Sequence, residues 1–140
     1  MSKKKKLRSQ RYTKGCQTFK KVSPKGPERI HQLLDDIAPD MAKFVMEFPF
    51  GDIYARPTLD MKTREMLTIA SLVSLGNAAP QLKSHIHNCL WAGVTKQEII
   101  EIIMQMSVYA GFPAAINGLL VAKKAFREMK SQKKGSRKSK

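Results

Sequence analysis

Twenty-one consecutive residues, from 102 to 122, carry no charged side chain, so any fold of this chain has to shield them from water. A run of this length can cross a lipid bilayer. Polar residues interrupt it, however, and the sequence Gly111-Phe112-Pro113 divides it near its middle. It also lacks the flanking aromatic residues that anchor membrane spans. The run therefore predicts two buried helices, and we expect no membrane contact.

Helical spacing of apolar residues continues through the middle of the chain, and no segment shows the alternation of a strand. Pro27 is placed to open a first helix that runs to Ile37. A second helix, residues 41–48, is expected to stop before Pro49, and residues 50–57 are expected to form a loop because glycine and proline break helices.

Capping signals delimit four further helices. Asp60 is a plausible N-cap for residues 62–75, which end at Gly76, and a fourth helix is expected over residues 80–92. Thr95 and Glu98 have the spacing of a capping box, which opens the fifth helix, and a sixth is expected over residues 113–129. The sequence thus predicts an all-α fold of about six helices.

Basic residues are concentrated at the two ends of the chain. The formal net charge is +15, but residues 1–26 and 123–140 together carry +18, so residues 27–122 have a net charge of −3. We expect a disordered basic leader over residues 1–25, one helical domain with a single core over residues 26–129, and a disordered basic tail over residues 130–140. Nonspecific contact with nucleic acid is then expected only through these mobile tails.

Two cysteines, Cys16 and Cys89, lack the spacing of a disulfide framework or a zinc module. No apolar segment follows the basic N-terminus, so a signal peptide is not indicated, and we expect a cytoplasmic protein. Three of the expected helices are apolar on more than one face, which predicts a homo-oligomer. A tightly packed monomer of six short helices remains the alternative.

Glu65, His85 and His87 are the ionisable residues that stand out within apolar helices. Each has a structural explanation: a carboxylate in the first turn of a helix gains from the helix dipole, and a helical histidine is more often a packing residue than a catalyst. His85 and His87 do not predict a metal pair, because residues two apart on a helix point to different faces. His31 is expected to be remote from any partner.

A series of blocks in this chain resembles the 4-carboxymuconolactone decarboxylase family across roughly residues 27–126. The order of the blocks makes the resemblance specific. The blocks are FGDIYARP at 50–57, LD at 59–60, KTREMLTIA at 62–70, QLKSHI at 81–86, AGVT at 92–95, EIIE at 98–101 and YAGFPAA at 109–115.

The resemblance implies an all-helical bundle similar to alkylhydroperoxidase D and a ring-like homo-oligomer, usually a hexamer. It places His85 at the family histidine and Glu65 at the family glutamate. In the thiol branch a CxxC pair precedes the histidine, but those positions are Ala78 and Gln81 here. A disulfide cycle needs two thiols within bridging distance, so Cys89 cannot replace the pair. The resemblance therefore indicates the decarboxylase branch.

That branch implies cofactor-free decarboxylation of 4-carboxymuconolactone, or of a related small carboxylated lactone, to 3-oxoadipate enol-lactone and carbon dioxide in aromatic-compound catabolism, the β-ketoadipate pathway. His85 would donate a proton or hydrogen bond, and Glu65 would orient it. Arg56 is the first candidate for binding a substrate carboxylate. The weaker candidates for substrate contact are Arg64, Gln81 and His87. Two alternatives stay open: a non-decarboxylating member with a stress or thiol-linked peroxidase function, and a nucleic-acid-binding protein acting through its tails.

Overall fold

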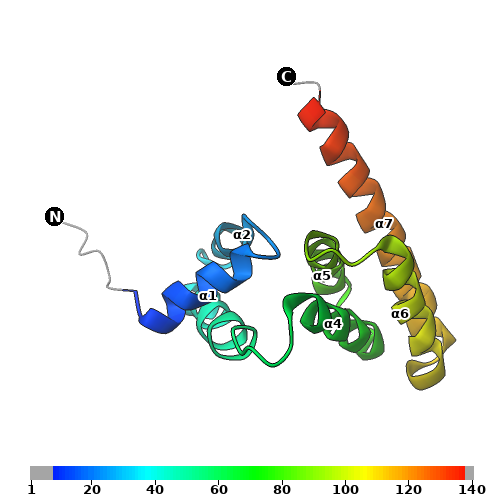
Figure 1. Ribbon diagram of the computed structural model, residues 1–140, viewed down its shortest axis with the longest axis horizontal. Coiled ribbons are helices and arrows are strands. Elements are labelled where there is room, and N and C mark those ends of the chain that lie inside the picture. Colours follow the sequence, from blue (N-terminus) through cyan, green and yellow to red (C-terminus); the bar gives the residue numbers. More distant parts are fainter. Residues whose placement is uncertain (1–7, 138–140) are drawn as a thin grey trace. The chain divides into compact units, whose positions relative to one another are not determined.

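The computed structural model describes residues 8–137, with side chains up to residue 132, and these residues form seven α-helices and one π-helix without a strand (Figure 1). The predicted all-α class is confirmed. Contacts divide the chain at Leu59 and Asp60 into two compact units, whereas the sequence predicts a single core. None of the helices described combines the length and the apolar character that crossing a membrane requires.

The first unit contains α1 (Gln10–Lys20), α2 (Gly26–Leu34), α3 (Pro39–Val45) and the π-helix η1 (Met46–Ile53). Helix α1 packs against η1, and the rings of Phe19 and Phe50 stack with their centroids 3.8 Å apart. The backbones approach closely at Gly15, where an added Cβ would lie 1.8 Å from the carbonyl oxygen of Met46. Only glycine fits this crossing.

The prediction of a disordered leader over residues 1–25 is wrong for α1. Ser9 caps the helix by accepting from the Tyr12 N–H, and Tyr12, Phe19 and Val22 are buried. The basic residues lie on the exposed side, where Arg11 pairs with Asp52 of η1. Composition therefore concealed an amphipathic helix, because its few apolar residues meet a partner distant in sequence. Residues 1–7 lie outside the described residues.

Residues 46–53 also differ from the prediction, since the helix neither stops before Pro49 nor gives way to a loop at residue 50. Proline cannot donate to the helix ladder, and its ring clashes with the carbonyl four residues earlier in an α-helix. The chain continues through Pro49 as the wider π-helix η1, with Phe50 and Gly51 buried. At the other end of this region, α2 ends at Leu34, short of the predicted Ile37.

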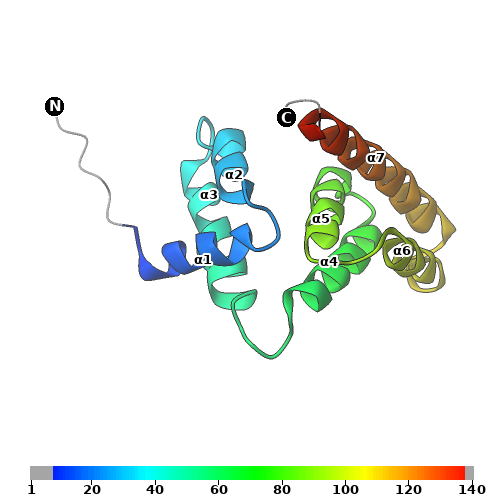
Figure 2. The same cartoon turned by 45° about the horizontal axis from the view of Figure 1, so that its top comes forward.

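The second unit contains α4 (Met61–Leu75), α5 (Ala79–Trp91), α6 (Lys96–Ala110) and α7 (Phe112–Arg137) (Figure 2). The predicted capping is confirmed: Asp60 accepts from the Thr63 N–H at 2.7 Å, and Thr95 and Glu98 form the capping box of α6. Gly76 ends α4 with a φ of +75°, which favours glycine.

The uncharged run forms the later part of α6 and the first part of α7, which are separated at Gly111 with a φ of +92°. These two helices pack side by side (Figures 1 and 2). All four helices of this unit contribute to one core: Ile69, Val73, Leu82, Ile86, Cys89, Val94, Ile99, Ile103, Ala122 and Ala125. Helix α7 continues to Arg137, so the prediction of a disordered tail from residue 130 is wrong up to that residue. Residues 138–140 lie outside the described part.

Candidate active site

A buried carboxyl group and a partly exposed imidazole meet between α4 and α5. His85 Nδ1 lies 2.7 Å from Glu65 Oε2. The Glu65 side chain is fully buried, whereas 23% of the His85 side chain is exposed. Because a carboxylate can only accept, the Nδ1–H donates to Glu65. The pair therefore joins the interior of the second unit to its surface.

Local sequence explains how the two helices present this pair. Asp60 fixes the start of α4, so Glu65 falls beyond the first turn and on the same buried face as Ile69 and Val73. The helix-dipole explanation for Glu65 is therefore wrong, because α4 has no acidic residue in its first turn. On α5, Leu82, Ile86 and Cys89 enter the core, and His85 lies at the edge of that face.

The second carboxyl oxygen of Glu65 has no partner. Glu65 Oε1 is the buried side-chain oxygen or nitrogen without a hydrogen bond among the described residues. Leaving a buried polar atom unsatisfied costs about 1–3 kcal/mol. A carboxyl group that only supported the fold would gain from a second donor, so this atom indicates that stability is not what Glu65 serves.

The hydrogen bond to Glu65 also determines which ring nitrogen of His85 can exchange a proton with a bound molecule. With Nδ1 occupied, Nε2 is the ring nitrogen that can face a bound molecule. In the neutral ring Nε2 accepts a proton, and in the imidazolium it donates one. The arrangement can therefore move a proton at Nε2.

Cys89 lies one turn after His85 on α5 and is a free, buried thiol. Burial, followed by the charge of Glu65, raises the pKa of this thiol. The neutral thiol is a poor nucleophile, since the reactive form is the thiolate. The environment of Cys89 thus adds to the absence of a CxxC pair in disfavouring thiol chemistry here.

The family comparison agrees with this geometry. The family model described as the carboxymuconolactone decarboxylase family matches residues 39–124, more than half of the chain. The chain belongs to the carboxymuconolactone decarboxylase family. The match includes α4 and α5 entirely, and with them both residues of the Glu65–His85 pair.

Three curated relatives of this carboxymuconolactone decarboxylase family member show how far the similarity extends. It is 35% identical to the 4-carboxymuconolactone decarboxylase of Acinetobacter baylyi over 86% of this chain and 90% of the relative. It is 38% identical over 68% of its length to an uncharacterized 15.0 kDa protein of Paracoccus denitrificans, covering 72% of that protein. It is 31% identical over 62% of its length to the nitrosuccinic acid decarboxylase of Metarhizium robertsii, covering 60% of that enzyme. The two named enzymes support a carboxy-lyase activity for this family member.

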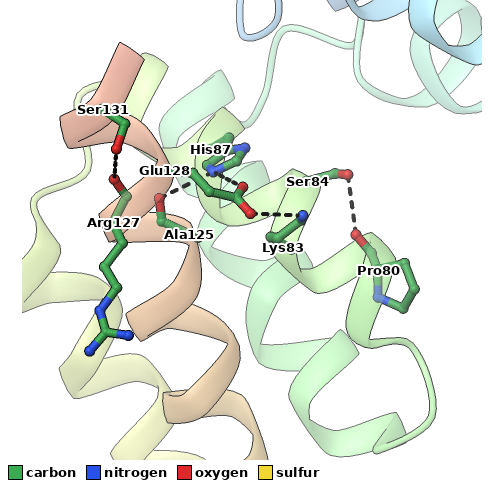
Figure 3. A network of polar contacts seen from close by, with 8 residues as sticks. All are labelled: Pro80, Lys83, Ser84, His87, Ala125, Arg127, Glu128 and Ser131. Carbon is green, nitrogen blue, oxygen red and sulfur yellow. Dashed lines mark hydrogen bonds and ion pairs between the residues drawn. The ribbon is translucent and has the colours of Figure 1, made fainter. Parts of the chain in front are cut away.

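The remaining predicted site residues lie in both units, and three of them share α4 or α5 with the pair. His87 contacts α7: its Nε2 lies 3.3 Å from the Ala125 carbonyl oxygen and 3.6 Å from Glu128 Oε2 (Figure 3). Arg64 immediately precedes Glu65 on α4, and Gln81 is exposed one turn before His85 on α5. Arg56 is exposed in the first unit, after η1. The roles of Arg56, Arg64, Gln81 and His87 in binding substrate stay predictions.

His31 in this family member has two partners, so the prediction that it is remote from any partner is wrong. Its Nε2 lies 2.7 Å from the Tyr12 hydroxyl, and its Nδ1 lies 2.8 Å from Asp35 Oδ1. The spacing of four residues between His31 and Asp35 was the available sequence signal.

In the described part of the chain, no three His, Cys, Asp or Glu side chains gather in a way that could bind a metal ion.

Proposed function

We propose that this protein decarboxylates 4-carboxymuconolactone, or a related small carboxylated lactone, to 3-oxoadipate enol-lactone and carbon dioxide without a cofactor, as a cytoplasmic step of aromatic-compound catabolism. The observation that carries the proposal is the Glu65–His85 pair, with its buried, half-satisfied carboxyl group and its partly exposed imidazole. The 35% identity to a 4-carboxymuconolactone decarboxylase supports this choice of substrate.

The decarboxylation requires the protein to donate a proton and to stabilise the negative charge that develops on the substrate. When the carbon–carboxylate bond breaks, its electron pair delocalises through the unsaturated lactone as a dienolate, and carbon dioxide leaves. In the proposed mechanism His85 Nε2 delivers a proton to carbon, or donates a hydrogen bond to the dienolate oxygen. Glu65 holds the ring by accepting from its Nδ1–H, which leaves Nε2 as the ring nitrogen that faces the substrate.

Substrate carboxylates require cationic partners. Arg64 is our candidate from the second unit, because it adjoins Glu65 on α4, and Arg56 is our candidate from the loop that follows η1. A guanidinium can bind a carboxylate through two parallel hydrogen bonds, which fixes the orientation of the substrate. Gln81, one turn before His85, is the nearest exposed amide on α5 and is proposed to contact the substrate.

We also propose that the active form is a homo-oligomer, with a hexamer expected from the family resemblance. Both units expose large apolar side chains. Near the junction of α6 and α7 the exposed fractions reach 75% for Val108, 78% for Tyr109 and 71% for Phe112. Large apolar side chains left exposed in this number usually mark an interface. A second copy of the chain is the partner that the resemblance implies.

The test is direct turnover. Purified protein is mixed with 4-carboxymuconolactone, loss of the lactone is followed by ultraviolet absorbance, and released carbon dioxide is measured in parallel. Nitrosuccinic acid is assayed as the competing substrate, because its nitro group could also accept the electron pair and because one relative is named for it. Stoichiometric carbon dioxide from the lactone supports the proposal. Turnover of nitrosuccinic acid alone would show that this acid, and not the lactone, is the substrate. Turnover of neither compound would refute the proposal.

A further inference from the structure

A groove of about 430 Å³ runs between the first turns of α6 and residues 119–130 of α7. This volume lies within the range of roughly 300–1,000 Å³ that is common for small-molecule sites. Four of its lining residues are cationic, and none is acidic: Lys96, Lys123, Arg127 and Lys130. None of the lining residues belongs to the Glu65–His85 pair.

The cations are not neutralised by the acidic residues nearby. Glu128 of α7 is paired with Lys83 and His87, and Glu98 of α6 is paired with Lys62. Glu101 accepts instead from the Gln97 amide. Within the described residues, no ion pair involves any of the four groove cations. The groove therefore concentrates positive charge that lacks a counterion from the protein.

The spacing of the basic residues on α7 separates the groove from the packed face of the helix. Lys123, Arg127 and Lys130 follow one another at intervals of four and three, which aligns them along one side. Glu128 lies on the side toward α5, where it meets Lys83 and His87, and Arg127 extends away from α5 (Figure 3). The cations thus form a row beside α6.

Beneath the cations the groove is apolar. Ile100 of α6 and Leu119 and Phe126 of α7 line it, and the Lys96 ammonium group lies 5.4 Å from the centre of the Phe126 ring. A lysine over an aromatic ring keeps its charge at the edge of an apolar surface. A ligand that satisfies both parts has an apolar body and an acidic head.

We propose that this groove binds an amphiphilic organic anion, a medium-chain or aromatic carboxylate, with its body on Ile100, Leu119 and Phe126 and its head among Lys123, Arg127 and Lys130. Charge complementarity selects an anion, and the apolar floor selects against small inorganic anions. The volume of about 430 Å³ suits one small molecule. A nucleic acid would use the cations but leave the apolar floor empty.

The test is calorimetric titration of the full chain with decanoate below its micelle concentration. We expect decanoate to bind at one site per chain. Decanol, which has no charge, should bind at least tenfold more weakly, and acetate, which lacks an apolar chain, should show no detectable binding. The double variant K123Q/R127Q removes two charge-assisted contacts and should weaken decanoate binding at least tenfold. The double variant K43Q/K124Q is the control, because it changes the net charge equally at exposed positions outside the groove.

The three lysines and the arginine mutated here are exposed, so the variants are expected to fold, and circular dichroism checks that they do. Equal affinity of the two double variants for decanoate would overturn the proposal. So would the absence of detectable binding to the wild-type chain at 1 mM decanoate. A short DNA duplex that binds in a K123Q/R127Q-sensitive way, while decanoate does not bind, would assign the groove to nucleic acid instead.

Discussion

Replacing Glu65 with methionine should stabilise the protein while removing its proposed activity. The Glu65 side chain is fully buried, has one hydrogen bond to His85, and leaves Oε1 without a partner. Apolar replacement of buried ionic groups is often neutral or stabilising by about 1–4 kcal/mol. His85 is partly exposed, so its Nδ1–H can turn to water once the carboxyl group is gone. We therefore expect Glu65→Met to raise the free energy of unfolding by about 1–3 kcal/mol.

Removing the other partner, His85, should lower the free energy of unfolding. His85→Ala leaves the buried Glu65 carboxyl group with no partner at either oxygen, which for a buried charge costs about 3–5 kcal/mol. Urea unfolding, followed by circular dichroism, measures both changes. Ile69→Met is the control, because Ile69 is fully buried one turn further along α4 and a volume-conserving exchange there should cost less than about 1.5 kcal/mol. A loss of more than 1 kcal/mol in Glu65→Met beyond this control would refute the reasoning, because Glu65 would then be a structural residue.

Four further predictions concern the scaffold. Gly15→Ala should destabilise the first unit by about 1–3 kcal/mol in urea, because the new Cβ would lie 1.8 Å from the Met46 carbonyl oxygen, and an unchanged midpoint would contradict the α1–η1 crossing. Deleting residues 1–25 should lower the helix content measured by circular dichroism by more than α1 alone, because α1 covers Phe50; a loss limited to α1 would show that it is not structural. Asp60→Ala should lower the melting temperature at pH 7. The Thr63 backbone N–H lowers the pKa of Asp60 in the folded state. The difference in melting temperature should therefore vanish as the pH falls below the usual aspartate pKa of about 3.9 and through the folded-state pKa. A difference that stays constant with pH would exclude the cap. Light scattering after gel filtration should give a mass several times 15.8 kDa at micromolar concentration, and a monomer would contradict self-association.

Features encoded locally could be predicted from the sequence. The Asp60 cap, the Thr95–Glu98 capping box and the breaks at Gly76 and Gly111 depend on neighbouring residues, and the structure confirms all of them. Helix α1 could not be predicted in this way. Its basic composition resembles a solvated tail, but its buried residues meet partners distant in sequence: Phe19 stacks on Phe50, and the Tyr12 hydroxyl contacts His31. Tertiary packing here outweighs composition.

The candidate site also has features that the sequence could predict and features that it could not. Glu65 and His85 are twenty residues apart on different helices, so no periodicity connects them, and their pairing was expected from the family resemblance alone. The unsatisfied Oε1 atom is visible only in three dimensions. The groove was missed for a different reason: Lys123 and Arg127 lie in a helix that the sequence predicts, but Lys96 and Ile100 of α6, which complete the groove, are distant in sequence.

Turnover of 4-carboxymuconolactone by His85→Ala, Glu65→Gln and the double variant tests the central claim most directly. If His85 supplies the proton and Glu65 orients it, His85→Ala should lower kcat by about 10²–10⁴-fold, and Glu65→Gln should slow the same step. The double variant should be hardly slower than the slower single variant, because both residues serve one proton transfer. His87→Ala is the control, since His87 contacts α7 instead of Glu65. Wild-type kcat in both single variants, or independent multiplicative losses in the double variant, would contradict the account.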